Sequence, residues 1–298
     1  MSRARRSHPP TLIKLVERAL NTECRLERGA RVVLGVSGGG DSQALLDVLA
    51  RLAPRQGFEL FAHAVDHGLR PEASAELDLA EALARSHRVS FGRSKLRLAP
   101  GGNLMARARA ARYQALSEAA ARAGASLVAT AHHADDRAET VLLRLLRGAG
   151  PRGLCVLPAR AGALVRPMIR ARRTDVQAHL GRHGIPFATD PSNENPRFAR
   201  TRVRRELLPL LEELSPRIVE HLVALADQLE AGSPPDLRDP TGAPLPLGRA
   251  HVRALVQALG KRDPGAQIWL PGGRVAQFDP VSGTARIARG AAKRRKSD

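Results

Sequence analysis

The sequence predicts an α/β protein whose main domain is a Rossmann-like parallel sheet with helices on both faces, followed by a helical linker and a small C-terminal domain. Between residues 30 and 190, short apolar runs alternate with longer stretches of helical periodicity. Strands that are apolar on both faces and separated by amphipathic helices are typical of a parallel sheet covered on both sides. The length of 298 residues is enough for one large domain and one smaller one.

The order of these segments predicts where the functional residues lie. The expected strands are residues 31–36, 59–65, 88–91, 126–131 and 164–168. The expected helices are residues 42–52, 72–86, 103–123, 135–147 and 174–183. Ligands of such sheets bind at the carboxyl ends of the strands. The chemistry should therefore follow Val36, Val65 and Ala131.

Four segments are expected along the chain. They are an N-terminal extension with a helix in residues 1–29, the α/β domain in 30–195, a basic helical linker in 196–232, and a small C-terminal domain with a basic tail in 233–298. Within the last two, the pattern predicts helices over 197–214, 216–231 and 248–259, and strands over 267–270, 275–278 and 284–288.

The charge balance points to a polyanionic partner. The chain has 48 Lys and Arg against 29 Asp and Glu, a net charge of +19. Genome-wide bias can replace Lys by Arg, but it does not create an excess of bases over acids, so nucleic acid is the first candidate. Cys24 and Cys155 give neither a disulfide framework nor a thiolate metal cluster, which suits a reducing cytoplasm. No apolar stretch is long enough to span a membrane, and we expect no membrane partner.

A glycine-rich turn after the first strand predicts a phosphate-binding loop. Its residues are Ser37, Gly38, Gly39, Gly40, Asp41 and Ser42. Glycines let backbone N–H groups approach an anion, and the following helix points its positive end at the same place. A Walker loop would need Lys where Asp41 stands, whereas an acid can hold a Mg²⁺ ion that bridges phosphate oxygens. The alternative is a plain strand–turn–helix connection.

Further polar groups follow the later strands. Asp66 ends the second apolar run, although Asp-His-Gly is also good turn chemistry. After the fourth run, Asp136 and Glu139 share one face of a predicted helix, and His132 lies just before it. Acids in a first helical turn also occur as ordinary responses to the helix dipole. Adjacent histidines point apart, so Mg²⁺ with a cationic substrate fits this segment better than zinc.

Arginines follow the loop-like segment at residues 190–193. They are Arg197, Arg200, Arg202, Arg204 and Arg205. Without acids among them, they favour contact with phosphates over a solvated helix face.

These segments together resemble one family, the bacterial tRNA(Ile)-lysidine synthetases of the N-type ATP pyrophosphatase, or PP-loop, superfamily. The matching segments are residues 37–42, 63–70, 112–113, 131–140, 147–154, 166–167 and 190–211, in the order of the family. The glycine-rich loop is shared by the whole superfamily. The His-His-x-x-Asp-x-x-Glu-Thr and Arg-Gly-x-Gly-x-x-Gly-Leu runs are much more specific.

The resemblance implies a reaction. ATP would adenylate the wobble cytidine of tRNA(Ile) with a CAU anticodon, and the ε-amine of L-lysine would displace AMP to leave lysidine. Residues 37–42 and Asp66 would bind ATP, and Asp41 and Asp136 would bind Mg²⁺. The residues expected at the reacting groups are Asp41, Arg112, His132, Asp136, Glu139 and Arg202.

The sequence departs from the family at two positions and leaves rival functions open. Arg137 stands where the family most often has Gln, and Thr201 replaces a usual Asn. A tRNA cytidine thiolase would share the loop, but such enzymes usually carry C-x-x-C pairs. A non-catalytic, Arg-rich RNA-binding protein is the other alternative, and the intact acids oppose it. The oligomeric state stays open, a homodimer included.

Overall fold

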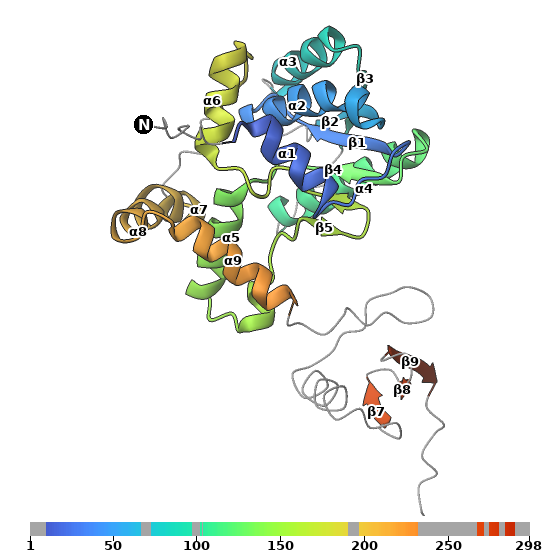
Figure 1. The fold of residues 1–298 in the computed structure, drawn as a ribbon, viewed down its shortest axis with the longest axis vertical. Coiled ribbons are helices and arrows are strands. Elements are labelled where there is room, and N and C mark those ends of the chain that lie inside the picture. The colour runs from blue at the N-terminus through green and yellow to red at the C-terminus, as the bar shows by residue number, and fades with distance from the viewer. Residues whose placement is uncertain are drawn as a thin grey trace, which may run out of the picture. The chain divides into compact units, whose positions relative to one another are not determined.

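The computed structural model describes residues 10–66, 73–96, 102, 104–189, 197–231, 267–270, 274–279 and 284–289. The chain divides into two compact units, Met1–Glu230 and Ala231–Asp298 (Figure 1). Each unit is described by itself. The expected helix at 248–259, the loop at 190–196 and the basic tail lie outside the described residues.

The first unit is built on a six-stranded sheet in the order β3-β2-β1-β4-β6-β5. The strands are β1 Arg31–Val36, β2 Glu59–Asp66, β3 Ser90–Lys95, β4 Leu127–Ala129, β5 Arg160–Ala161 and β6 Leu164–Val165. All neighbouring pairs are parallel except β5 and β6. The predicted fold class is confirmed. After β3 the chain crosses to the other side of β1 and adds β4 there, so the order in which strands are added reverses between β1 and β4. Folds of this kind bind ligands at such a reversal.

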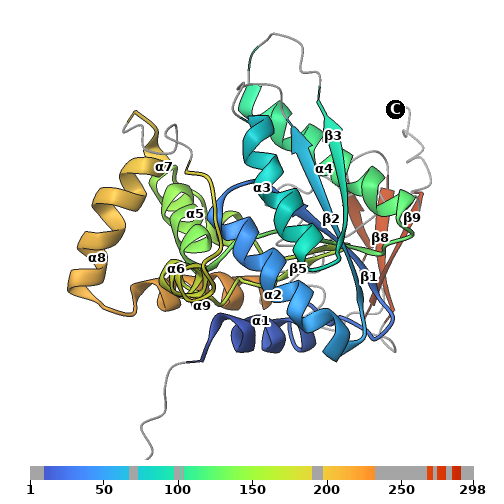
Figure 2. The same cartoon turned by 90° about the horizontal axis from the view of Figure 1, so that it is seen from above.

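Helices cover both faces of this sheet (Figure 2). They are α1 Leu12–Asn21, α2 Gly40–Gln56, α3 Ala73–Ser86, α4 Leu104–Arg122, α5 Ala134–Leu146 and α6 Arg173–His183. Alternate side chains of β1 enter different cores: Val32 and Leu34 join the core that includes α1, α2, α3 and α6, and Val33 joins the core under α4. This alternation is the reason why the strand reads as apolar on both faces.

A third apolar core lies around α5. It includes a short 3₁₀ helix, Pro151–Leu154, and the C-terminal helices of the unit, α7 Ala199–Arg202, α8 Leu208–Leu214 and α9 Ile218–Ala231. A π-helical turn, Val203–Leu207, joins α7 to α8. Pro209 cannot donate a backbone hydrogen bond and its ring crowds the preceding turn, which favours the wider turn there. The expected basic helical segment therefore packs on α5, while the four expected segment boundaries stay a prediction.

Two local differences from the predicted elements have simple causes. The expected strand at 164–168 is in the sheet only at Leu164–Val165, because Arg166 turns back and its amide donates to the Ala159 carbonyl at 2.8 Å. The antiparallel strand β5 was not predicted, since two exposed residues carry no periodicity.

In the second unit the described residues form a three-stranded antiparallel sheet, β7 Gln267–Leu270, β8 Arg274–Asp279 and β9 Thr284–Arg289, in that order. These strands match the three expected at 267–270, 275–278 and 284–288. Leu270, Val275 and Ala276 are buried.

Arg137 connects α5 to α9 inside the third core of the first unit. Its side chain is fully buried, its Nε donates to the Val156 carbonyl at 2.9 Å, and its guanidinium pairs with Asp227 and Glu230 of α9. Arg137, which replaces the usual Gln, therefore faces α9. These partners of Arg137 lie away from the Asp136–Glu139 pair.

We expect Arg137→Met to lower the free energy of unfolding by about 2–4 kcal/mol, because it leaves a buried carbonyl without its donor and removes the link to α9. Urea unfolding followed by circular dichroism measures this. Arg144→Met, an exposed arginine on the same helix, is the control and should cost less than about 1 kcal/mol. Equal losses in the two variants would contradict the assignment.

Candidate active site at the sheet's switch point

The loop after β1 is held in shape by its own side chains. Gly39 is the N-cap of α2, and Ser42 sits in the first turn of that helix. The Ser42 hydroxyl accepts from the Ser37 amide at 3.0 Å and lies 2.9 Å from the Gly39 carbonyl. From outside, the Ala188 amide donates to the Gly38 carbonyl at 2.8 Å. The loop is therefore preformed at the positive end of α2.

Two neighbouring glycines of this loop have different surroundings. A Cβ at Gly38 would lie 2.2 Å from the backbone oxygen of Glu76, so packing alone requires glycine there. A Cβ at Gly39 would meet only the Ser37 hydroxyl, at 3.5 Å. Gly39 has φ −73° and ψ 152°, which any residue can adopt. The space beside Gly39 is the place where a phosphate could approach the backbone.

His133, which is fully buried, connects this loop to α5. It is the N-cap of α5: its Nδ1 accepts from the Asp136 amide at 3.4 Å, and the Asp136 carboxylate accepts from the His133 amide at 3.2 Å. Its Nε2 has no hydrogen-bond partner among the described residues, yet it lies 3.7 Å from Asp41 and 3.6 Å from Asp136. Burial lowers the pKa of this ring, but the carboxylates of Asp136 and Asp41 outweigh burial and raise it.

The residues that meet at His133 fit a magnesium ion. Asp41 and Asp136 lie within 3.7 Å of the same ring nitrogen, one beside the phosphate loop and one at the start of α5. Burial would raise the pKa of Asp136, but His133 and Arg200 hold it below its usual range, so the carboxylate is ionised. Two carboxylates next to an anion-binding loop are the donor set that Mg²⁺ uses with phosphates.

Glu139 is the most enclosed carboxylate of the site. Its side chain is fully buried, and three arginines bind it: Arg173 of α6 at 3.0 Å, Arg200 of α7 at 2.8 Å and Arg204 at 2.6 Å. Arg200 also reaches Asp136 at 2.9 Å. The predicted acidic pair is therefore covered by the basic segment.

Arg202 lies outside this cluster. It pairs with Glu206 at 2.9 Å, and its side chain is 65% exposed. On a helix, residues four apart share a face, so Arg200 and Arg204 turn toward the acids while Arg202 turns away. The predicted role of Arg202 near the base stays a prediction.

His132 faces a different group of residues. Its Nδ1 lies 3.0 Å from the Thr130 hydroxyl. Burial, helped by Arg166, lowers the pKa of His132 to about 4 although Asp136 opposes the shift, so the ring is neutral at pH 7. The charges of Arg112 and Arg109 act on the same ring. Arg112 lies 5.6 Å from the centre of the Tyr113 ring.

The remaining predicted residues lie around the same edge of the sheet. Asp66 ends β2 and pairs in register with Lys95 of β3. Residues 67–70 and 190–193, which carry the other quoted motifs, lie outside the described residues.

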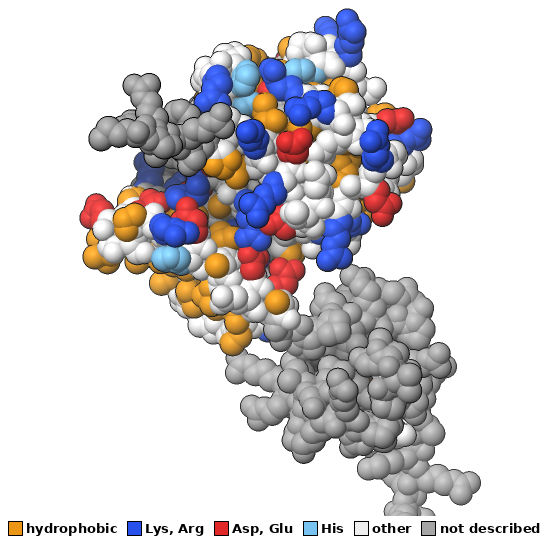
Figure 3. All heavy atoms as spheres, in the orientation of Figure 1, with side chains coloured by type: hydrophobic (Ala, Val, Ile, Leu, Met, Phe, Trp, Pro, Cys, Tyr) orange, Lys and Arg blue, Asp and Glu red, His pale blue; other side chains and the backbone are white. Residues whose placement is uncertain are grey.

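A pocket of about 250 Å³ opens beside Glu139, between α5, α6 and α8. Its charged lining residues are Asp135, Glu139, Glu212, Arg172, Arg173 and Arg204. Arg172 connects its walls, because it binds Asp135 at 3.1 Å and also pairs with Glu212. Figure 3 shows Lys and Arg side chains in the hollow between α6 and α8. The pocket thus offers both signs of charge at short range.

Sequence reasoning missed Arg173 and His133, and it assigned Arg200 and Arg204 to phosphates although both pair with Glu139. Arg173, Arg200 and Arg204 hold Glu139, and His133 rather than His132 joins the two acids. The spacing of Arg200 and Arg204 could have indicated that they share a partner, since residues four apart lie on one helix face. The two histidines gave none, because which of them enters the core depends on where α5 begins.

Comparisons with known proteins agree with a phosphate-binding site at this position. Residues 12–211 match the family model of the PP-loop domain. The chain is 36% identical to the tRNA(Ile)-lysidine synthase of Thermobifida fusca over 86% of this chain and 82% of that protein. It is 42% identical to that of a Methylobacterium strain, over 78% of this chain and 71% of that protein.

The chain belongs to the tRNA(Ile)-lysidine synthase family. It also matches the synthase of Leifsonia xyli, 41% identical over 68% of this chain, but spans only 62% of that protein's length. It spans 56% and 44% of two further relatives. Among solved structures, the U34-tRNA thiolase NcsA of Methanococcus maripaludis, with its [4Fe-4S] cluster, shares the fold: the TM-score is 0.63 at 17% identity, over 77% of this chain and 88% of that chain.

The helices that the structure describes include none with the length and apolar character needed to cross a membrane.

We expect Gly38→Ala and Gly39→Ala to differ in stability. Gly38→Ala should lower the free energy of unfolding by about 1–3 kcal/mol, because the new methyl group collides with the backbone at Glu76. Gly39→Ala should change it by less than about 0.5 kcal/mol. Urea titrations of both variants make the comparison, and a larger loss for Gly39→Ala would contradict the described packing.

Proposed function

We propose that this chain uses ATP and L-lysine to convert the wobble cytidine of tRNA(Ile) with a CAU anticodon into lysidine. ATP adenylates the carbonyl oxygen of the cytosine ring and releases pyrophosphate. The ε-amine of lysine then attacks the carbon of that carbonyl group, loses a proton, and displaces AMP. The observation that carries the proposal is the meeting of Asp41 and Asp136 on His133, beside a preformed phosphate loop, in a member of this family.

The phosphate loop and the pair of Asp41 and Asp136 bind different parts of the ATP–metal complex. Backbone N–H groups at Gly39 and the start of α2 bind the departing pyrophosphate. Asp41 and Asp136 are the residues that would hold Mg²⁺. When bound, the ion offsets the charge of the phosphate oxygens as the bond between the α- and β-phosphates breaks. His133 stays between the two carboxylates and fixes their directions.

The neutral His132 ring suits a role in the second step. The attacking ammonium must first lose a proton. With a pKa of about 4 the His132 ring is a weak base, so its role is to accept a hydrogen bond that orients the amine. Arg112 lies in the same group, where a guanidinium can bind the AMP phosphate or the cytosine carbonyl oxygen. We therefore place the cytidine between the phosphate loop and α4.

Lysine is placed in the pocket between α5, α6 and α8. Its α-carboxylate suits the arginines of that pocket, and its α-ammonium suits Asp135 and Glu212. Because Glu139 is already bound by three arginines, its role is to position them, and through them Asp136, as lysine enters. This arrangement keeps the cationic substrate next to the acids that the sequence predicted.

The arginines of α7 and the π-helical turn provide the surface for tRNA. Arg202 and Arg205 are exposed on this segment, close to the acids that Arg200 and Arg204 cover. Their positive charge would bind the tRNA backbone with the salt dependence of phosphate contacts. A tRNA substrate implies a cytoplasmic location.

We expect Asp41→Ala and Asp136→Ala each to abolish incorporation of labelled lysine into unmodified tRNA(Ile), while tRNA binding changes by less than about threefold. Both lose a carboxylate of the Mg²⁺ pair but keep the arginine surface. The assay measures lysine incorporation together with AMP and pyrophosphate release. Circular dichroism of each variant confirms that it is folded.

The outcomes distinguish the rival functions. Full activity in either variant would overturn the role of the acid pair. Pyrophosphate release by the unaltered protein without lysine transfer would indicate another PP-loop enzyme that modifies tRNA bases, such as a thiolase. No ATP consumption at all would favour the non-catalytic RNA-binding alternative.

We expect Glu212→Gln to raise the KM for lysine about tenfold, the effect of one charge-assisted hydrogen bond. The KM for ATP should stay the same, because Glu212 lies on α8, outside the phosphate loop. Glu213→Gln, an exposed neighbour on the same helix, is the matched control. An unchanged lysine KM in Glu212→Gln would move lysine out of this pocket.

A further inference from the structure

A second cluster of titratable side chains surrounds Asp47, in the middle of α2. The Asp47 carboxylate is buried, and two histidines reach its two oxygens: His87 lies 2.8 Å from Oδ1, and His179 of α6 lies 2.8 Å from Oδ2. None of these residues belongs to the site described above. The cluster joins α2, α6 and the end of α3.

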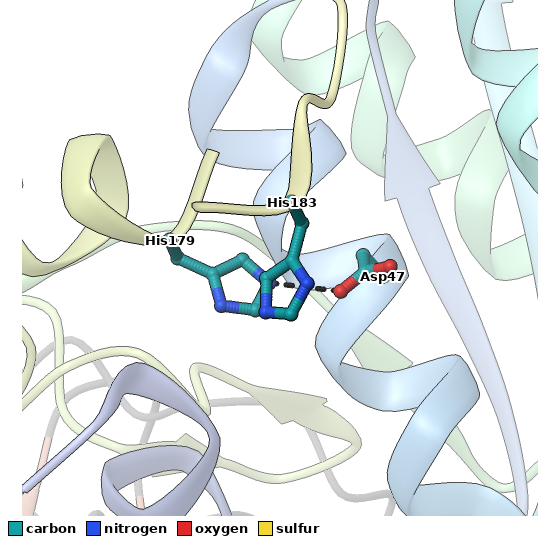
Figure 4. Close-up of side chains that lie close together, drawn as sticks. All are labelled: Asp47, His179 and His183. Atoms are coloured by element: carbon teal, nitrogen blue, oxygen red, sulfur yellow. Dashed lines mark hydrogen bonds and ion pairs between the residues drawn. The ribbon is translucent and has the colours of Figure 1, made fainter. Parts of the chain in front are cut away.

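His183 completes the group from one turn further along α6. Its ring centroid lies 4.5 Å from that of His179. Asp47, His179 and His183 each offer one ligand atom, and these three atoms all lie within 4.8 Å of one another. Figure 4 shows both imidazoles turned toward the carboxylate. His183 is at least partly exposed, so solvent reaches the group from one side.

The donor set and its spacing suit a transition metal. Two imidazoles four residues apart on one helix face, with a carboxylate from a second helix, are N and O ligands of the kind that zinc binds. His87 holds the other carboxylate oxygen, as residues around a metal ligand usually do. A solvent molecule would occupy the open side next to His183.

We propose that Asp47, His179 and His183 form a binding site for a zinc-class divalent transition metal. Its ligands lie on α2, the helix that begins at the phosphate loop, and on α6. It is independent of the proposed reaction, since none of its ligands takes part in it.

One cation competes with the metal. Arg51 donates from Nε to Asp47 Oδ2 at 2.7 Å, and its Nη2 lies 3.5 Å from Nδ1 of His183. The Arg51 side chain is 41% exposed, so it can swing into solvent when a metal enters. The metal must displace this arginine, which predicts a moderate affinity and a tighter site once the arginine is removed.

The position of the cluster gives the metal a structural effect. Asp47 lies on the helix that begins at the phosphate loop, and His179 is next to Leu180, whose side chain would be 3.0 Å from a Cβ at Gly40. A metal shared by α2 and α6 would fix α6 against the first turn of α2. We expect it to raise the thermal stability of the first unit.

The test is a titration of the full chain, freed of metal by a chelator, with Co²⁺ and then with Zn²⁺. Bound Co²⁺ should give the visible absorption of a low-coordinate nitrogen and oxygen site, Zn²⁺ should bleach it, and Zn²⁺ should raise the Tm. His183→Gln should weaken binding more than about tenfold, and Arg51→Met should strengthen it. The Tm without metal shows that His183→Gln is folded.

His221→Gln removes an exposed histidine of α9 and is the matched control, which should bind as the unaltered chain does. Equal Co²⁺ affinity in His183→Gln and the unaltered chain would overturn the proposal, because the metal would then bind elsewhere. A Co²⁺ spectrum that stays that of the hydrated ion would overturn it as well.

Discussion

The first unit depends on one buried carboxylate, that of Glu139. A charge removed from water is costly unless other charges surround it, and Glu139 has no exposed surface. Its compensation comes from Arg173 on α6 and from Arg200 and Arg204 on the segment after the loop. α6 and the segment that carries Arg200 and Arg204 cannot both separate from α5 without leaving that charge unpaired. The ion cluster therefore fixes the basic segment over the acids beside the phosphate loop.

This cluster also explains why the net charge of the chain describes the site poorly. The chain carries +19, but around α5 the arginines 172, 173, 200 and 204 face the acids 135, 136, 139 and 212. Local charges nearly balance there, so the excess positive charge lies elsewhere on the surface, where it can attract a polyanion. The lysine proposed for this pocket carries two ammonium groups and one carboxylate, and a purely basic cleft would repel it.

The sequence predicted those features that depend on local pattern, and it failed where three-dimensional register decides. The strand that ends at Val36 and the glycine turn after it follow from periodicity and backbone freedom, and the structure has both. The choice between Arg200 and Arg202 depends on where α7 begins, and a propensity pattern fixes such a boundary only within a few residues. His132 and His133 present the same difficulty at the start of α5. Asp47, His87 and His179 are far apart in the sequence, and only the topology of the sheet brings them together.

Under the proposed function, the positions of α2 and α5 determine how ATP can bind. Both helices begin at the carboxyl ends of β1 and β4, which are neighbours in the sheet, so their positive ends share one region. In the free protein, Asp41 and Asp136 supply the negative charge that these helix ends and His133 attract. An incoming triphosphate would meet the same two carboxylates and be repelled. A divalent cation held by Asp41 and Asp136 would offset that repulsion, so under the proposed function ATP would bind together with its metal.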